Sequence, residues 1–318
     1  MPGTTAKLTS LSHLGLAVEV ALGTPILPTA WMPIMKFTPQ DDLVYVPDQG
    51  MRGQPAKTFG NYLGVESSSY QVDGMVYPLS FGNILAAFFG LDTVSGVAPY
   101  VHTFSTLGTG LPSFTISDYY VAQARQWAGS RCDSLQIKFT PEAGLQFTAK
   151  YIGFLSVTYV VEATTTFEVE PFFLGWQAAL MLGGSSNNKL ISYTLNLTRE
   201  KSAAVFAANN SQTPYDIFMG DVVGEYSLEF VMNDDTEYAL ALAQGVKACS
   251  VTFTQDATHI LKLTSTSIQF TKPTIDRSGP YVVCTIDGEA NWNSTDGGVA
   301  AAVLTNSTVA AYSTTAAS

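Results

Sequence analysis

The stretch SLQIKFTPEAGLQFTAKY, residues 134–151, decides the fold class of this 318-residue chain. Apolar Leu135, Ile137 and Phe139 alternate with polar residues, and the same two-residue period returns from Leu145 to Tyr151. Because successive side chains of a strand point to opposite faces, each run predicts a strand with one buried face. The intervening PEAG, residues 141–144, is typical of a turn. The stretch therefore predicts a β-hairpin that packs one face into a core.

The same period recurs through the second half of the chain. Threonine is frequent at the outward positions, as strands prefer. The apolar members of these runs are Ile191, Tyr193, Leu195, Leu197, Tyr226, Leu228, Phe230, Val251 and Phe253. We therefore expect a mainly β chain.

Two short helices are predicted. Residues 83–91 gather an apolar face and reach Gly90, which can end a helix. Residues 234–244 begin with Asp234 as a candidate N-cap, with Glu237 three residues on and Gly245 as a stop. A further apolar segment, residues 172–182, is expected to be a connector. The large apolar helical side chains, namely Ile84, Leu85, Phe88, Phe89, Tyr238 and Leu242, are expected in the core.

The chain is poor in charge and acidic. Only 13% of its residues are charged and 46% are hydrophobic, against ~25% charged in average globular chains. This composition fits a surface covered by copies of the same chain, and equally a secreted β-rich protein. With 15 Lys and Arg against 26 Asp and Glu, the net charge of −11 argues against gripping nucleic acid. It fits either a solubility role or a channel wall of the same sign as DNA.

Cysteine and hydropathy patterns bound the setting. The three cysteines, Cys132, Cys249 and Cys284, include no C-x-x-C spacing, so neither a disulfide framework nor a zinc site is expected. This fits a reducing compartment such as bacterial cytoplasm. No run approaches 18 apolar residues, so we expect no membrane span. The apolar run 14–22 contains Glu19 and no persuasive cleavage pattern, so it is assigned to the mature protein rather than to a signal peptide.

Catalytic motifs are missing from the sequence. It contains no G-x-S-x-G, no H-E-x-x-H, no phosphate loop and no dinucleotide fingerprint. Neighbouring carboxylates such as Asp41 and Asp42 point to opposite faces of a strand, which is unsuited to paired acid chemistry. The scattered Trp31, Trp127, Trp176 and Trp292 could line a sugar groove but are more typical of a core. We predict no enzyme, no cofactor and no metal.

The order of the predicted elements repeats between the two halves. Each half has a strand, a long loop, a second strand, a helix and further strands. The elements are 36–46, 74–81 and 83–91 in the first half, and 191–198, 224–230 and 234–244 in the second. The phrases IKFTP, residues 137–141, and IQFTKP, residues 268–273, come late in each half. This order favours an internal duplication.

The joint between the halves is expected near GGSSN, residues 183–187, a flexible polar stretch. We accordingly predict an N-terminal arm over 1–30, a first domain over 31–183 and a second domain with a C-terminal tail over 184–318.

Two long loops are candidates for contacts with other chains, because long loops inside compact domains are commonly functional. The first spans residues 47–70 and the second residues 199–219. Exposed strand edges in a charge-poor β protein also invite pairing with another chain. The candidate contact residues are Glu19, Arg52, Lys57, Phe59, Tyr62, Arg199, Glu200, Lys201, Phe206 and Tyr215.

Residues 15–33, GLAVEVALGTPILPTAWMP, resemble the opening of siphophage major tail tube proteins, which share a G-x-A-x-E, G-T-P, P-T pattern. Further resemblance lies in LPSFTI at 111–116, in Gly183-Gly184 before a strand, and in VLTN at 303–306 with Tyr312 following. These marks span nearly the whole chain and are specific through their order. The loop over 47–70 shows no motif of the family.

The resemblance implies two tandem tube domains of β-barrel or β-sandwich type, each with one short flanking helix. Subunits of the family close into rings whose inner strands surround an acidic lumen, and rings stack through long loops and terminal arms. A duplicated chain implies a trimer with six quasi-equivalent domains; without duplication the ring is a hexamer. The hairpin over 134–151 and the strands around 260–272 are expected to face the lumen, although Lys138 and Lys150 do not fit a purely acidic wall.

The implied function is structural: a tail tube that conducts DNA into the host without sequence-specific binding. Implied partners are the chain itself, the tape measure protein, the tail terminator and the distal tail protein. The implied location is the virion tail, assembled in the host bacterial cytoplasm, with no sheath. Two rival functions stay open: another virion β-protein, such as a decoration or fibre component, and a secreted carbohydrate-binding or hydrolysing β-sandwich.

Overall fold

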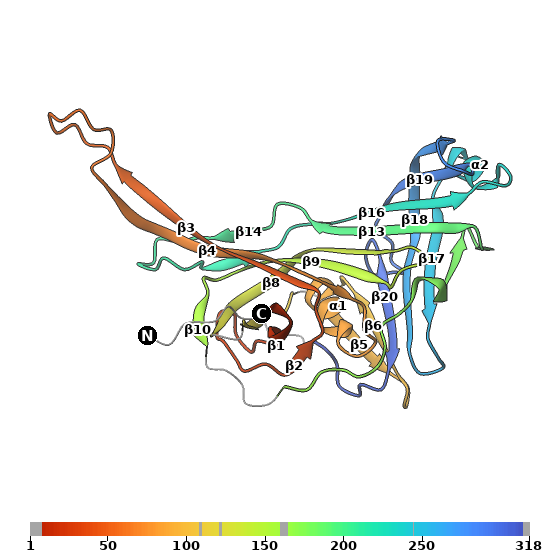
Figure 1. Ribbon diagram of the computed structural model, residues 1–318, viewed down its shortest axis with the longest axis horizontal. Coiled ribbons are helices and arrows are strands. Elements are labelled where there is room, and N and C mark those ends of the chain that lie inside the picture. Colours follow the sequence, from red (N-terminus) through yellow and green to blue (C-terminus); the bar gives the residue numbers. More distant parts are fainter. Residues whose placement is uncertain (1–7, 108–109, 121–122, 160–164, 244, 314–318) are drawn as a thin grey trace.

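The computed structural model describes residues 8–107, 110–120, 123–159, 165–243 and 245–313. Nearly all strands join one large sheet, and two short helices pack beside it (Figure 1). The expectation of a mainly β fold with one short helix in each half is confirmed. The buried apolar residues form one continuous cluster that includes members of both halves.

The hairpin at 134–151 lies at the centre of the sheet. Strand β8 (Ala124–Phe139) pairs antiparallel with β9 (Gln146–Gly153), so that Leu135 faces Ala149 and Ile137 faces Phe147. All four side chains are buried. The predicted hairpin, with its buried face, is therefore confirmed.

Eight strands form a continuous antiparallel layer that passes through both halves. Its order is β3 (Lys36–Asp48), β4 (Gly60–Met75), β9, β8, β13 (Leu190–Arg199), β16 (Val222–Val231), β19 (Val283–Ala290) and β18 (Ile260–Asp276). Figure 1 shows the layer turning, from strands that run across the view to upright strands at the right. Strong twist of this kind follows from the right-handed twist of each strand.

Helix α1 (Phe81–Phe89) is almost completely buried, because eight of its nine residues are apolar or glycine. It ends where Gly90 adopts φ 87°, a conformation that glycine accepts readily. The predicted preceding strand over 74–81 is wrong, since β4 stops at Met75 and a turn leads into the helix.

Helix α2 (Thr236–Leu242) is shorter than predicted. Asp234 accepts the Thr236 backbone N–H at 2.9 Å, so it initiates the turn, whereas Asp235 holds the N-cap position. Glu237 is turned away from the helix start and bonds Asn187 at 2.7 Å. Tyr238 packs against the core as expected, but Leu242 is 59% exposed, so the core prediction was wrong there.

The connectivity of the first half recurs in the second. Strands β1 (His13–Val18), β2 (Ala30–Met32), β7 (Phe114–Tyr119) and β10 (Val157–Tyr159) correspond to β11 (Ala178–Leu182), β12 (Ser185–Asn187), β17 (Lys247–Thr254) and β20 (Ala301–Asn306). The strand pairings also recur between the halves. Each first-half pairing is given with its counterpart: β1–β2 with β11–β12, β1–β7 with β11–β17, β3–β4 with β13–β16, β4–β9 with β16–β19, β7–β8 with β17–β18, β8–β9 with β18–β19, and β8–β10 with β18–β20.

A β-bulge marks the same place in both copies of this pattern. In β8 the register shifts between Cys132 and Ser134, opposite Tyr151 and Lys150. In β18 it shifts between Phe270 and Lys272, opposite Gly288 and Asp287. In each case the strand beyond the bulge's partner carries a tyrosine at this level of the sheet. Tyr70 of β4 pairs with Tyr151, and Tyr226 of β16 pairs with Gly288. Bulges are retained features of a fold, so this match adds to the shared pairings.

Each half also has an element that the other lacks. The hairpin β5 (Leu91–Ser95) and β6 (Tyr100–Ser105) follows α1, and β6 pairs with β20, which also pairs with β18. In the second half, β14 (Ala203–Val205) and β15 (Asp216–Phe218) form a small separate sheet.

Several predicted loops and connectors are ordered. The segment 47–70 is mostly the two strands β3 and β4, so the predicted long loop reduces to the turn over 49–59. The segment 172–182 is a 3-10 turn (Gly175–Gln177) followed by β11. Gly183 and Gly184, with φ 58° and 85°, form the tight turn of the β11–β12 hairpin. The predicted terminal arm lies within the sheet from His13 to Val18, after a 3-10 turn over Thr9–Leu11.

Candidate assembly surfaces

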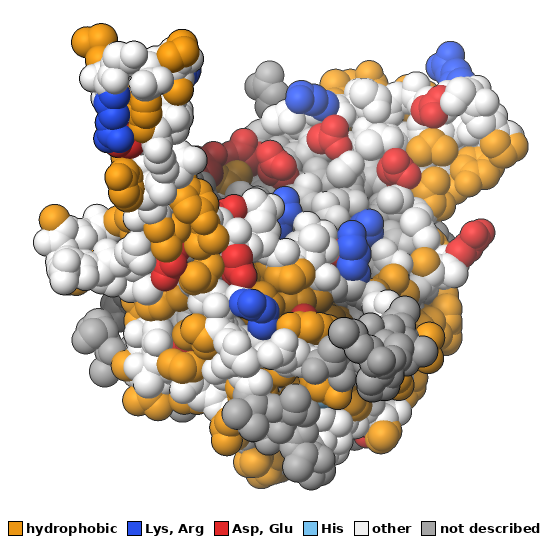
Figure 2. Space-filling model, turned by 60° about the vertical axis from the view of Figure 1, so that its left-hand side comes forward, with side chains coloured by type: hydrophobic (Ala, Val, Ile, Leu, Met, Phe, Trp, Pro, Cys, Tyr) orange, Lys and Arg blue, Asp and Glu red, His pale blue; other side chains and the backbone are white. Residues whose placement is uncertain are grey.

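The end of the β3–β4 hairpin, residues 43–63, projects from the body as a separate arm (Figures 1 and 2). Strand side chains alternate between faces, and here both faces lack a covering layer. Its exposed apolar residues are Leu43, Val44, Tyr45, Val46, Met51, Tyr62 and Leu63. Met51 is fully exposed at 103% and Tyr62 at 65%. Apolar side chains gathered on a projecting element are candidates for contact with another molecule.

Asp48 organises the tip of the arm. Its carboxylate forms an ion pair with Arg52 and accepts the Gly50 backbone N–H at 3.1 Å. The Arg52 guanidinium lies 5.0 Å from the centre of the Phe59 ring. Among the predicted contact residues, Arg52 and Phe59 are therefore brought together, while Lys57 and Tyr62 stay exposed along the same arm.

The second predicted loop packs beside the base of the arm. The backbone carbonyl of Gln212 accepts the Glu66 backbone N–H at 3.0 Å, and the side-chain amide of Gln212 donates to the Leu63 carbonyl at 3.2 Å. Arg131 of β8 forms an ion pair with Asp216 of β15 at 3.0 Å. The predicted contact residues Phe206 and Tyr215 are exposed at 38% and 67%. The arm and the segment 199–219 thus lie together at one end of the molecule.

Two of the predicted contact residues are internal. Glu19 is 2% exposed, and its carboxylate accepts hydrogen bonds from Gly23, Thr115 and Gly129 at 2.8–2.9 Å. Arg199 is 9% exposed and donates to the Phe88 carbonyl of α1 at 2.7 Å. Burial lowers the pKa of Arg199. Both residues join separate segments of the chain.

Glu200 and Lys201 follow Arg199 at an exposed turn. Lys201 adopts φ 61°, which is uncommon for a residue with a side chain and is typical of a tight turn. These two charges therefore lie on the surface near the start of the segment 199–219.

The eight-stranded layer leaves one face to solvent, which we call the polar face. One row crosses every strand in the order Lys36, Asp73, Thr148, Gln136, Asn196, Glu225, Glu289 and Gln269. Side-chain hydrogen bonds run along it, from Thr148 to Asp73 and from Gln136 to Asn196, each at 2.7 Å. The alternation of polar and apolar residues in the sequence predicted β8, β9, β13 and β16, but only the register aligns the polar residues into rows across the layer.

Charge is unevenly divided over the polar face. The first half presents Lys36, Lys138 and Lys150 with Asp42 and Asp73, and the second half presents Glu225, Glu229, Asp276, Asp287 and Glu289 with Lys272. Glu225 lies directly opposite Glu289. Like charges in this arrangement destabilise a sheet, so the fold accepts a cost on this face.

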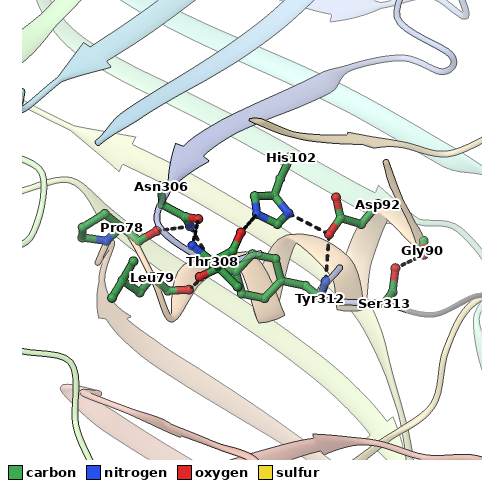
Figure 3. Close-up of polar contacts among 9 residues, drawn as sticks. All are labelled: Pro78, Leu79, Gly90, Asp92, His102, Asn306, Thr308, Tyr312 and Ser313. Atoms are coloured by element: carbon green, nitrogen blue, oxygen red, sulfur yellow. Dashed lines mark hydrogen bonds and ion pairs between the residues drawn. The ribbon is translucent and has the colours of Figure 1, made fainter. Parts of the chain in front are cut away.

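The C-terminal segment is anchored by a cluster of buried polar groups, the C-terminal clamp, formed by Asp92, His102, Asn306, Thr308, Tyr312 and Ser313 (Figure 3). His102 Nδ1 lies 3.0 Å from Asp92 Oδ2, and Nε2 lies 2.8 Å from the Thr308 carbonyl oxygen. Both neighbours are hydrogen-bond acceptors. Asp92 Oδ2 also accepts the Tyr312 backbone N–H at 2.8 Å.

Tyr312 fixes the clamp against α1. Its hydroxyl donates to the Leu79 carbonyl at 2.6 Å, and burial raises the pKa of Tyr312 to about 12. A Cβ at Gly82 would lie 2.3 Å from the Tyr312 ring, so only glycine allows the ring to approach the helix this closely. The tail thus packs on the first half although the sequence places it last.

Metal binding and cysteine reactivity depend on how the described His, Cys, Asp and Glu side chains are arranged. Among them no group of three His, Cys, Asp or Glu side chains is arranged to hold a metal ion. The three cysteines are buried, and burial raises the pKa of each thiol, which disfavours the reactive thiolate. No helix in the described part of the chain is long and apolar enough to cross a membrane.

A sheet with an uncovered polar face and an apolar projecting arm suits a structural subunit that contacts other chains. A family model described as phage tail tube protein matches residues 9–290 of the 318. The chain belongs to the phage tail tube protein family, as its resemblance to tube proteins predicted. This family is structural rather than enzymatic and is found in the virion tail. A search of curated proteins found no match.

Proposed function

We propose that this chain is the major tail tube protein of a long-tailed, sheathless bacteriophage, and that rings of it stack into a hollow tube that conducts DNA into the host. The observation that carries the proposal is the polar face, because it crosses both halves without a covering layer. A sheet packed on one face and wet on the other suits the wall of a water-filled channel.

The ring contains three copies, and each copy supplies two tube domains. The repeated pairings and the matching bulges support this count, because each half then occupies an equivalent sector of the ring. The joint between the domains lies between Tyr159 and Ala178, since the predicted boundary at 183–187 falls inside the β11–β12 hairpin. A hexamer of whole chains would present two different domains in every sector.

The polar face lines the lumen and contacts DNA without reading its sequence. Asp, Glu, Ser, Thr, Asn and Gln dominate it, and carboxylates repel phosphate weakly across water. The lysines of the first half, Lys138 and Lys150, lie on the same face and reduce the repulsion in their sectors. These charged side chains interact with the phosphates of the DNA backbone rather than with the bases.

The arm reaches the adjacent ring, where its apolar residues become buried. The segment 199–219, which carries the exposed Phe206 and Tyr215, contacts the base of the arm and lies at the same end of the subunit. The tape measure, tail terminator and distal tail proteins are the further partners, and assembly takes place in the host cytoplasm.

Negative-stain electron microscopy of the untagged protein at high concentration tests the proposal. We expect hollow rings or tubes whose end-on averages show three-fold symmetry with a pseudo-six-fold modulation. True six-fold averages would overturn the three-copy ring while keeping the tube. Solid fibres, or a monomer that binds glycans, would contradict the tube and favour the fibre or carbohydrate-binding functions.

A further inference from the structure

The eight-stranded layer has two open edges. Strand β3 pairs with β4 on one side, and no other described strand pairs with it. Residues 269–276 of β18 pair with β19 on one side only, because β17 and β20 meet β18 at residues 260–268. Open edges expose unpaired backbone donors and acceptors that another strand can satisfy.

The repeat shows what covers these edges. Strand β13 has the place in the second half that β3 has in the first, and β8 has the place of β18. Inside the chain, β8 pairs with β13. We infer that β18 of one copy pairs antiparallel with β3 of a second copy, so that the contact between copies repeats the contact between the halves.

The bulges set the register of this contact. Aligning the two bulges places Lys272 at the position of Ser134 and Asp276 at that of Lys138. Aligning Tyr70 with Tyr226 places Asp42 at the position of Thr198 and Thr38 at that of Thr194. Since Ser134 pairs with Thr198 and Lys138 with Thr194, Lys272 lies opposite Asp42 of the next copy, and Asp276 lies opposite Thr38.

Charge complementarity supports this register. Lys272 is exposed and Asp42 is half-buried on the polar face, and among the described residues neither forms an ion pair within its own chain. Asp42 is already oriented by Gln40, whose amide donates to it at 2.7 Å. A cross-strand pair of opposite charge stabilises a sheet.

The number of strands also favours this contact. With eight antiparallel strands in the layer, the two outer strands run in opposite directions, so copies joined edge to edge continue the antiparallel pattern. Each edge also carries a proline, Pro39 or Pro273, which lacks a backbone donor and is tolerated at sheet edges. Because the prolines reduce the number of backbone hydrogen bonds at this contact, the register depends more strongly on the side-chain pair Lys272–Asp42.

Disulfide trapping tests the register. In the variant with Asp42→Cys and Lys272→Cys, the two thiols lie directly opposite one another across the contact, within the reach of a disulfide. The native cysteines are buried and do not compete. Mild oxidation of assembled protein is expected to give covalent dimers and closed trimers on a denaturing gel, and the single variants give neither.

A register-shifted pair is the matched control. In the variant with Gln40→Cys and Lys272→Cys, the thiols lie on the same face two residues apart along the strand, at about 7–8 Å, and cross-link at least about tenfold less. Equal cross-linking of both pairs, or none in protein that forms rings by microscopy, would overturn the register. If the wild type forms no rings at all, the tube function on which this inference rests is contradicted instead.

Charge reversal gives a second measurement. Lys272→Asp and Asp42→Lys are each expected to raise the concentration at which rings form by about tenfold, and the double reversal to restore it. Thermal unfolding of the monomer shows whether each variant still folds. A double reversal that assembles no better than either single variant would refute the pair.

Discussion

His102 joins the C-terminal tail to the first half through contacts to two acceptors, Asp92 Oδ2 and the Thr308 carbonyl oxygen. Both side chains are completely buried. Removing one partner of a buried hydrogen bond leaves the other group unsatisfied, which is destabilising.

We expect Asp92→Ala to lower the free energy of unfolding by about 3 kcal/mol, measured by urea denaturation. Asp92→Asn retains an acceptor for the Tyr312 N–H and should lose less. Asp221→Ala, at an exposed position, is a control with little effect. Equal stability of the Asp92→Ala variant and the wild type would show that the clamp contributes nothing.

Asp118 predicts a pH dependence. Burial raises its pKa from 3.8 to about 6, so the folded chain retains a proton that the unfolded chain has already lost. Stability therefore falls as pH rises from about 4 to about 6, and the penalty is fully present above about 6. Asp118→Asn removes this penalty.

The expected result is that Asp118→Asn unfolds at a higher temperature than the wild type at pH 7.5, and that the difference shrinks toward pH 4. The comparison isolates Asp118 because Glu168 and Asp133, whose pKa values are also raised by burial, are unchanged in the variant. A difference that stays constant with pH would exclude this titration as the cause.

Single residues were the hardest to predict. Glu19 and Arg199 carry charges that favour a surface, and their burial depends on donors and acceptors brought close only by folding, such as Gly129 and the Phe88 carbonyl. Arg52 and Tyr62 were expected at the surface and lie there, because no other segment of the described chain covers these two side chains.

At the scale of elements, the arm is the part whose removal should separate ring formation from stacking. Replacing Met51 and Tyr62 by Ser is expected to leave single rings and to remove long tubes, because the variant buries less apolar surface between rings. Tube lengths in electron micrographs measure the effect.

The control for the arm variant is Trp292→Ser, which removes an exposed aromatic side chain outside the arm. Full-length tubes from the Met51 and Tyr62 variant would show that the arm does not join rings.

Strands were predictable where one face is buried, as in β8 and β9, because burial imposes a two-residue period. The outer part of β4 escaped this logic and was predicted as part of a loop: residues 61–63 are exposed on both faces, so the period that marks a strand is missing. Turn residues also misled, since Gly183 and Gly184 suggested a linker but form a hairpin turn.

At the scale of the whole molecule, the halves share a sheet and a core. Strand β8 pairs with β13, β6 pairs with β20, and one buried cluster contains residues of both halves. Neither half buries its own edges fully without the other.

We therefore expect one cooperative heat-unfolding transition for the unassembled chain, measured by calorimetry. A fragment ending at residue 159 is expected to remain largely unfolded or to aggregate, since it lacks the partners of β8 and β6. Two separate transitions would show that the halves are independent folding units.

Among the described residues the β5–β6 hairpin has no counterpart in the second half, and its turn carries Val97 at 84% exposure. In a ring of three chains a peptide inserted at this turn would be displayed three times, on alternate sectors, rather than six. Cargo grafted there along a tube would follow a sparser lattice than the tube's own pseudo-six-fold repeat, which leaves room between neighbouring copies for a folded domain.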